Sequence, residues 1–359
     1  MTEKLTNIEG LACPLPLPHN QRIVLGHGSG GRMSYDLISK VFLSALDNPI
    51  LRIGDDAGTM FIPNNPSEPG CRLAISTDSH VVMPLFFPGG DIGRLAVCGT
   101  INDVAMLGAD PQFLTAGFVL EEGLDVDILS RVVDSMRSAT LEANVQIIAG
   151  DTKVVQNGKA DGLYINTTGF GVIPPGVNIS GTRAQPGDVV IISGTIGDHG
   201  IAVLAARGEL KFETQIISDV APLNGLVKTM LDTTKEIHVL RDPTRGGLAT
   251  SLNEIAIQSK VGIKIYEDGI PVKLAVSAAC EMLGFDPLYV ANEGKLIAIV
   301  NKTYADQLLS AMKLHPFGTD AAIIGTVTAD ANEHVTLKTT FGTTRMVDML
   351  SGEMLPRIC

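Results

Sequence analysis

Residues 185–192, Gln-Pro-Gly-Asp-Val-Val-Ile-Ile, decide the fold that we predict for this chain. The first four residues have the composition of a turn. The last four form a continuous apolar run, which is typical of a strand buried on both faces in an α/β domain. The stretch lies near the middle of 359 residues, a length that favours two domains. We therefore expect a two-domain α/β (α+β) fold with its boundary at about residues 175–185.

Outward from this boundary, apolar runs of strand length alternate with apolar residues at helical spacing. Before it we expect strands at 72–76, 146–149 and 163–173, and helices at 93–107 and 126–143. After it we expect helices at 202–207, 223–233 and 248–259, and strands at 189–192, 262–266, 296–300 and 323–327. The resulting domains are residues 22–180 and 181–344.

The two ends of the chain lack these periodic patterns. Residues 1–21 contain prolines at 14, 16 and 18, and we expect a flexible leader. Residues 345–359 have no clear amphipathic pattern, and we expect a mobile tail that ends at Cys359. Its fourteen steps span roughly 45 to 50 Å when fully extended, so the tail could reach an active site.

Composition and charge exclude several classes of function. The formal net charge of -12 argues against nucleic acid as a partner, because phosphate backbones are bound through clustered Lys and Arg. No apolar run approaches the ~20 residues that span a bilayer, and the first residues do not resemble a signal peptide. We therefore expect a cytoplasmic protein without a membrane partner. The five cysteines form no CxxC pair, so we expect neither a zinc site nor a disulfide framework.

A series of carboxylates at turns after apolar segments is the strongest chemical signal. Brought together, these side chains would hold Mg²⁺, which prefers carboxylate, phosphate and water oxygens. Each one taken singly could equally be a turn or helix-cap residue. The residues are Asp55, Asp56, Asp78, Asp103 and Asp151.

Several other motifs carry weaker signals. The glycines from Gly28 to Gly31 precede a helix and could wrap a phosphate, although such loops are often only connectors. Arg245, just before another helix, suits either an anion contact or a tight domain joint. Lys153 could neutralise a transferring phosphoryl group, and Glu293 would by default be a solvated charge on a turn.

Cys359 is the last residue, so it cannot have core neighbours on both sides. An exposed thiol is oxidisable and is normally avoided on a surface unless it is used. A thiol on an arm is chemically well suited to carry an acyl-type group.

Taken together, the motifs of residues 22–359 resemble the HypE family of hydrogenase maturation proteins. The stretches that carry the resemblance are His27-Gly28-Ser29-Gly30-Gly31, Gly54-Asp55-Asp56-Ala57, Ser76-Thr77-Asp78-Ser79-His80, residues 87–93, Gly150-Asp151-Thr152-Lys153, residues 242–247 and Pro356-Arg357-Ile358-Cys359. The resemblance implies the aminoimidazole ribonucleotide synthetase fold, a homodimer paired through the N-terminal domains, and ATP in an acidic cleft near that interface.

The resemblance also implies a reaction. HypF would load the Cys359 thiol with a carbamoyl group, and the carbamoyl oxygen would attack the γ-phosphate of ATP. A base would then remove the N–H protons and expel phosphate, which leaves a thiocyanate. The nitrile would pass to iron on a HypC–HypD scaffold as a cyanide ligand of [NiFe]-hydrogenase.

In this interpretation the matching residues take three roles. The catalytic candidates are Cys359, Lys153, Glu293 and His27, with Glu293 preferred over His27 for proton handling. ATP would contact Gly28, Gly30, Gly31, Asp55, Asp78, Asp103, Asp151, Thr152 and Arg245. Mg²⁺ would be held by Asp55, Asp56, Asp78, Asp103 and Asp151.

Three alternatives stay open from the sequence. Selenophosphate synthetase has a reactive Cys or selenocysteine in its glycine loop, and this loop has none. Thiamine-monophosphate kinase shares the paired acids but has no reason to end in cysteine. A non-catalytic thiol carrier would need neither the acids nor the glycine loop.

Overall fold

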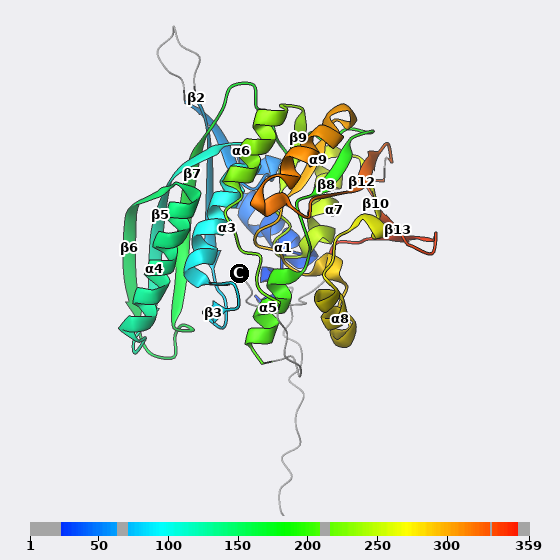
Figure 1. Ribbon diagram of the computed structural model, residues 1–359. Helices are drawn as coiled ribbons and strands as arrows, with labels where there is room; N and C mark the ends of the chain where they lie inside the picture. Colours follow the sequence, from blue (N-terminus) through cyan, green and yellow to red (C-terminus); the bar gives the residue numbers. More distant parts are fainter. Residues whose placement is uncertain (1–22, 63–70, 209–215, 331, 351–359) are drawn as a thin grey trace, which may run out of the picture.

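The computed structural model describes residues 23–62, 71–208, 216–330 and 332–350, which form two domains (Figure 1). Each domain is built on one large sheet with helices packed against it. Among the described residues, no helix has the length and apolar character needed to cross a membrane. Residues 1–21 and Cys359 lie outside the described ranges, so the predicted leader and carrier thiol stay predictions.

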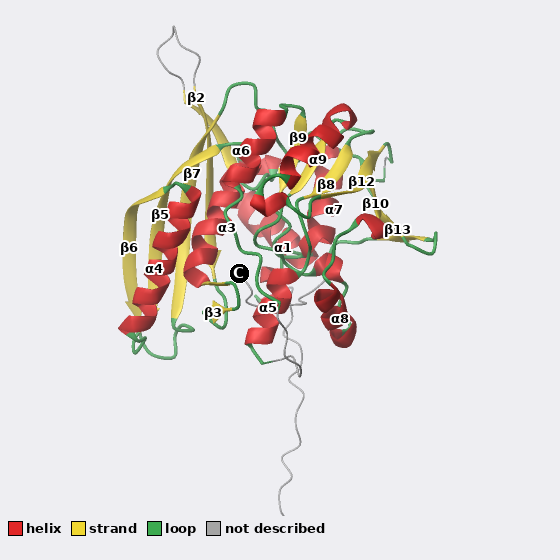
Figure 2. Ribbon diagram, in the orientation of Figure 1, coloured by secondary structure: helices red, strands yellow, loops and turns green. Residues whose placement is uncertain are grey.

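The first domain has a five-stranded sheet in the order β1-β2-β7-β5-β6. All neighbouring strands are antiparallel except β5 and β6. Helices α3 and α4 cover one face of this sheet (Figure 2). The elements are β1 (Gly58–Ile62), β2 (Cys71–His80), β3 (Phe86–Phe87), β4 (Gly90–Asp91), α3 (Ile92–Met106), β5 (Asp110–Glu121), α4 (Val126–Ala143), β6 (Gln146–Val155) and β7 (Leu163–Ile173).

A run of short helical segments precedes the first sheet. It begins with the glycine loop and ends just before the two adjacent acids Asp55 and Asp56. The segments are η1 (Leu25–Gly28), α1 (Arg32–Leu37), η2 (Ile38–Phe42), α2 (Leu43–Leu46) and η3 (Leu51–Ile53).

The second domain has a seven-stranded mixed sheet in the order β14-β13-β10-β12-β8-β11-β9. Its strands are β8 (Val189–Ile192), β9 (Ile237–Arg241), β10 (Gly262–Tyr266), β11 (Ile297–Val300), β12 (Ala322–Thr328), β13 (Val335–Lys338) and β14 (Thr344–Met346). Its helices are α5 (Asp198–Ala206), α6 (Asn224–Thr233), α7 (Gly247–Ser259), η4 (Glu267–Gly269), α8 (Leu274–Leu283), η5 (Pro287–Tyr289), η6 (Lys302–Tyr304), α9 (Ala305–Lys313) and η7 (Pro316–Gly318).

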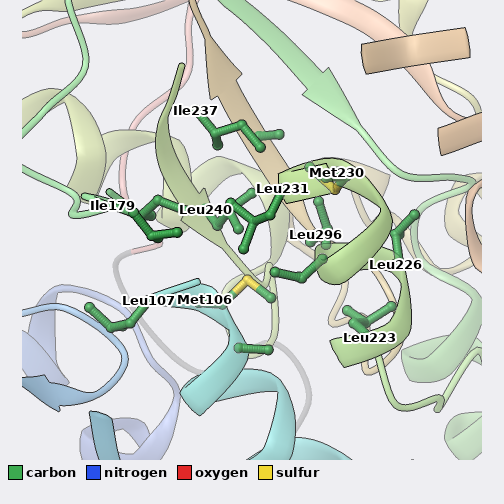
Figure 3. Close-up of a cluster of buried hydrophobic side chains, with 14 of the residues drawn as sticks. Met106, Leu107, Ile179, Leu223, Leu226, Met230, Leu231, Ile237, Leu240 and Leu296 are labelled. Atoms are coloured by element: carbon green, nitrogen blue, oxygen red, sulfur yellow. The ribbon is translucent and has the colours of Figure 1, made fainter. Parts of the chain in front are cut away.

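One hydrophobic core joins the two domains. Met106 and Leu107, at the end of α3, pack among side chains of α6 and β9 in the second domain (Figure 3). Met106, Met230 and Leu240 are all nearly inaccessible to solvent. Burying apolar side chains of this size contributes about 1.5 to 3 kcal/mol each, so the domains are held together firmly. The end of α3, with Asn102 and Asp103, is thereby fixed against the second domain.

The expected elements agree with the structure in type, and the apolar run at 189–192 is a strand with every residue buried. Two strands are longer than expected. Strand β2 continues through Asp78 to His80, and β6 continues through Asp151 to Val155, because each keeps pairing with its neighbour. The prediction that these two acids lie at strand ends is therefore wrong. They lie inside strands, where the pleat decides which face each side chain occupies.

The described part of the expected tail belongs to the second domain. Residues 344–346 pair with β13 as strand β14, and Val347 is buried. The chain is followed to Leu350, and residues 351–359 lie outside the described ranges. The expectation that the tail is free from residue 345 therefore does not hold for residues 345–347.

Candidate active site

Buried and partly buried acids from both domains meet at the domain junction, and we call this set the junction acids. Asp56 precedes β1, Asp78 lies in β2 and Asp103 in α3. From the second domain come Asp242, which follows β9, and Glu293, in the loop before β11. Asp56, Asp78 and Asp242 each raise the pKa of at least one other member, and the pKa values of Asp103 and Glu293 are raised in this way, which places the five acids within electrostatic range of one another.

Arg241 forms the ion pairs that tie the Gly54–Asp56 turn to the second domain. Its Nε lies 3.1 Å from an oxygen of Asp56, and its Nη1 lies 2.9 Å from an oxygen of Glu254 in α7. The arginine is buried, so both pairs are shielded from water. The neighbouring Asp55 accepts the N–H of Gly181 at 2.7 Å, which also joins the domains. Both acids of this turn therefore already have protein partners.

Asp103, the metal-ligand candidate in α3, is partly buried. It accepts a hydrogen bond from the Ser76 hydroxyl at 2.6 Å. Burial raises the pKa of Asp103 well above the usual carboxyl range, and the charges of Asp242 and Asp56 raise it further. Burial likewise raises the pKa of Asp56, against the opposing charge of Arg241. The site thus holds more carboxylates than it can easily keep ionised.

The two acids from the second domain also have raised pKa values. Burial raises the pKa of Asp242 to about 6, although Arg241 opposes the effect. Burial also raises the pKa of Glu293 well above its usual value, and the charges of Asp242 and Asp78 add to this. Glu293 is 4% exposed, so its default interpretation as a solvated turn residue is wrong. A carboxyl with a raised pKa is suited to accept and return protons near neutral pH.

The backbone of Glu293 is held by hydrogen bonds from both sides. Asp219 accepts its N–H at 3.1 Å, and the side-chain amide of Asn102 lies 3.4 Å from its carbonyl oxygen. Asn102 also donates to Ala221 and accepts from the backbone of Leu223. Asn102 is the residue before Asp103, so these contacts fix Glu293 relative to α3.

The glycine loop packs against the loop that carries Arg245. The Arg245 guanidinium donates to the carbonyl of Gly28 at 3.1 Å. Gly30 has φ +75, and a Cβ there would lie 2.7 Å from the backbone oxygen of Arg245, so only glycine fits. Arg245 in turn lowers the pKa of Glu293, so it lies within electrostatic range of the junction acids. His27, by contrast, contacts its own turn, with Nδ1 3.1 Å from the Val24 nitrogen.

Asp151 and Lys153 lie elsewhere, on the sheet face that α3 and α4 leave uncovered. We call this the bare face, defined by Ile75, Thr77 and Ser79 of β2, Tyr164, Asn166 and Phe170 of β7, Phe113 and Val119 of β5, and Asp151 and Lys153 of β6. Asp151 and Lys153 are about 70% exposed and form an ion pair at 2.8 Å. Hydrogen bonds from Lys153 and the Thr152 N–H lower the pKa of Asp151. Asp151 and Lys153, with Ser79 and Asn166, line a pocket of about 340 Å³.

Asp78 and Asp151 point to opposite faces of the same sheet. Asp78 pairs with Thr167, whose side chain is fully buried beneath α3, whereas Asp151 lies in the row that continues through Asn166 to Ser79. Three strand spacings separate them, about 14 Å along the sheet. One protomer therefore does not bring Asp151 to the junction acids.

The candidate metal ligands were tested as a set against this geometry. Among the described residues, no group of three or more His, Cys, Asp or Glu side chains is arranged to hold a metal ion unaided. The concentration of buried carboxylates nevertheless suits a hard cation that takes further oxygens from a phosphate ligand. The five-acid metal site stays a prediction, and the structure divides its members between the two regions.

Residues that the sequence did not single out complete the junction. Arg241 and Glu254 gave no signal, because an arginine at a strand end and an acid within a helix are ordinary in sequence. Ser76 stood in the motif Ser76-Thr77-Asp78, but without a role of its own. Asp242 did stand in a notable motif, Asp242-Pro243-Thr244-Arg245, but the arginine there drew the anion interpretation. An acid directly after an apolar strand was the signal that could have added it to the series.

Comparison with known proteins decides the family. Residues 54–173 match the AIR synthase related protein N-terminal domain, and residues 185–338 match the C-terminal domain of the same description. The chain is 56% identical over 340 residues to the carbamoyl dehydratase HypE of Azotobacter vinelandii, covering 95% of this chain and 98% of the relative. The chain belongs to the HypE family. The resemblance and the two-domain α/β fold predicted from the sequence are confirmed.

Solved structures of HypE proteins agree with this assignment. A HypE in complex with HypF is 52% identical and has a TM-score of 0.83, covering 88% of this chain and 99% of that chain. A HypE solved in complex with ATP is 49% identical and has a TM-score of 0.78, covering 94% and 100%.

Proposed function

We propose that this protein is an ATP-dependent carbamoyl dehydratase that converts a carbamoyl group on the Cys359 sulfur to a thiocyanate. The observation that carries the proposal is the set of buried and partly buried acids at the domain junction, in a chain that carbamoyl dehydratases of the HypE family match over 95% of its length. A kinase or a passive carrier would not need a buried carboxyl such as Glu293 within electrostatic range of Arg245.

The chemistry has two stages that balance. First, the carbamoyl oxygen attacks the γ-phosphorus of ATP, its bond to the β–γ bridging oxygen breaks, and ADP leaves. Second, the nitrogen loses its two protons as the carbon–oxygen bond breaks and inorganic phosphate departs. The product is S–C≡N, and the oxygen removed from the carbamoyl group ends in the phosphate. Phosphorylation is needed because oxide is a very poor leaving group.

In this proposal the junction residues take separate roles. Glu293 accepts a proton from the carbamoyl nitrogen, since its raised pKa matches the task. Arg245 and the glycine loop with Gly28, Gly30 and Gly31 face the phosphates. Asp78 and Asp103, with phosphate oxygens, would hold Mg²⁺, which offsets the charge of the triphosphate. His27, held within its own turn, is the weaker proton-handling candidate.

We also propose that two copies pair through the bare face. Ile75 and Phe113 are exposed on it, the partly buried Phe170 lies between them in the same row, and the two phenyl rings are 5.5 Å apart. A second copy laid across this face would cover that row. We propose further that Asp151, Thr152 and Lys153 of one chain then complete the site at the junction acids of the other, where Lys153 would support phosphoryl transfer.

For partners we propose a HypF carbamoyltransferase that loads Cys359 and a HypC–HypD scaffold that receives the cyanide. The HypE–HypF complex of a relative that is 52% identical supports the first of these. We place the protein in the cytoplasm, where thiols such as Cys359 stay reduced.

Mass spectrometry of the C-terminal peptide tests the function. The chain is loaded with carbamoyl by its carbamoyltransferase and then mixed with Mg-ATP. We expect the peptide that contains Cys359 to lose about one water mass while ADP and phosphate form in equal amounts. If the mass of the peptide stays unchanged, a carrier function is supported instead. The same holds if ATP is hydrolysed while the peptide loses no water.

A further inference from the structure

The last described residues of the chain, 347–350, run across the second domain towards the glycine loop. Strand β14 precedes them, and the backbone N–H of Val347 donates to Val335 at 2.9 Å. The Arg345 guanidinium also pairs with Asp286. We call residues 347–350 the tail root, because the nine residues that end at Cys359 follow it.

Three carbonyl oxygens of the tail root are each held by a different element. The side-chain amide of Asn253, in α7, donates to the Val347 carbonyl at 2.9 Å. The Tyr289 hydroxyl, at the end of η5, donates to the Asp348 carbonyl at 2.9 Å. The backbone N–H of Arg32 donates to the Leu350 carbonyl at 2.8 Å. These contacts hold the backbone whatever side chains the tail root carries.

The last of these contacts joins the tail root to the glycine loop. A Cβ on Gly31 would lie 2.2 Å from the Leu350 oxygen, so the close approach requires glycine at this position. One residue earlier, Gly30 makes a similar close approach to the backbone of Arg245, where a Cβ would lie 2.7 Å from the carbonyl oxygen. The glycine loop is thus packed between the tail root on one side and the arginine loop of the candidate active site on the other.

We call residues 351–359, which end at Cys359, the carrier arm. From this arrangement we propose that Asn253 and Tyr289 are positioning residues of the carrier arm, an inference that rests on the proposed function. By holding the carbonyls of Val347 and Asp348, they fix the point at which the arm leaves the second domain, beside the glycine loop. Nine further residues span at most roughly 30 Å, so the starting point of the arm limits where the Cys359 sulfur can go. A fixed start close to the junction raises the effective concentration of the carbamoyl group there.

The test compares two dehydration reactions: that of the carbamoyl group on the chain's own arm, and that of a carbamoyl group on a free peptide. The full-length double variant Asn253→Ala/Tyr289→Phe is loaded with carbamoyl, and single-turnover loss of water is followed at saturating Mg-ATP. We expect this rate to fall roughly three- to tenfold, because the arm starts from many positions instead of one. The KM for ATP should not change, and amide hydrogen exchange in residues 347–350 should become faster.

A second reaction separates positioning from general damage. The same double variant with Cys359→Ala is given a free carbamoylated peptide of residues 351–359 as substrate. This peptide does not depend on the tail root, so its dehydration rate should equal that of a chain carrying only Cys359→Ala. Tyr304→Phe, which removes a hydroxyl from a tyrosine on η6, is the matched control and should alter none of these values.

Two results would overturn the proposal. One is an unchanged single-turnover rate in the double variant although the unmodified sequence dehydrates its own arm. The other is an equal fall in the within-chain and peptide reactions, which would show damage to the active site. If the double variant does not fold, Tyr289→Phe alone carries the same comparison. Failure of the unmodified chain to lose water with ATP would instead refute the proposed function.

Discussion

Asp103 at the domain junction and Asp151 on the bare face differ in exposure, in hydrogen-bond partner and in the direction of their pKa shift. Asp103 is partly buried and accepts a hydrogen bond from Ser76, and burial together with neighbouring acids raises its pKa. Asp151 is about 70% exposed, and its ion pair with Lys153 lowers its pKa. Two carboxylates that serve one site from a single chain would share one environment. The difference shows that the two carboxylates do not share one site within a single chain, and under the proposed pairing the two regions would complete one another between chains.

The largest effect is expected where the junction is held together. Arg241→Met removes the buried partner of Asp56 and Glu254, and leaving such charges unpaired costs about 3 to 5 kcal/mol of unfolding free energy. Denaturant titration measures this loss. Arg137→Met is the matched control, since Arg137 pairs with Asp134 at the surface and should be nearly neutral. Equal losses in the two variants would contradict the structural role of the junction pairs.

The next effect concerns chemistry at the junction. Asp103→Asn keeps the size of the side chain but removes a charge from the candidate cation site. We expect ATP-dependent dehydration to slow by about 10²- to 10³-fold, as when one preorganised electrostatic group is removed. The loss of water from the carbamoylated C-terminal peptide reports the rate. Asp134→Asn on the surface of α4 is the control, and comparable rates in both would remove Asp103 from the mechanism.

The third effect is a pH-dependent change in stability at the junction. The pKa of Asp242 is raised from 3.8 to about 6, so its ionisation opposes folding. This cost is absent below pH 3.8, grows between pH 3.8 and 6, and is constant above. Asp242→Asn should therefore stabilise the free protein by about 1 to 3 kcal/mol at pH 7.5 and by almost nothing at pH 4, because one pKa unit corresponds to about 1.4 kcal/mol. Denaturant titrations at both pH values measure the difference, and a stabilisation that does not vary with pH would contradict it.

The smallest effect is expected on the bare face. Lys153→Met removes the partner of Asp151, but exposed ion pairs contribute little to stability. The melting temperature should stay within roughly 2 °C of the unmodified protein, while the dehydration rate falls. A large fall in melting temperature would contradict this, because it would show that the Asp151–Lys153 ion pair stabilises the fold.

Much of the fold followed from local patterns in the sequence. The apolar run 189–192, the strand 163–173 and the helix 126–143 have the expected bounds, because their periodicity and their burial agree. Strands β2 and β6 were expected to stop early, since Asp78 and Asp151 look like strand-ending residues. Pairing with the neighbouring strand overrides that local preference, and no pattern in a single sequence encodes the pairing.

The site was predictable only in part for a similar reason. Each acid of the series could be found from its place after an apolar segment, but its face could not. Whether Asp78 and Asp151 share a face depends on register across four strands, and one residue of register reverses the outcome. The burial of Glu293 and the role of Arg241 depend on the packing of one domain against the other. Under the family resemblance Glu293 was a candidate for proton handling, whereas local reasoning gave a solvated turn.

The claim that both regions form one site between chains has a direct measurement. Asp103→Asn and Asp151→Asn proteins, each inactive alone, are unfolded, mixed in equal amounts and refolded. If the site combines the junction of one chain with the bare face of the other, half of the dimers regain one intact site, and about a quarter of the normal dehydration activity returns. If each chain holds a complete site, mixing restores no activity, and the account is contradicted.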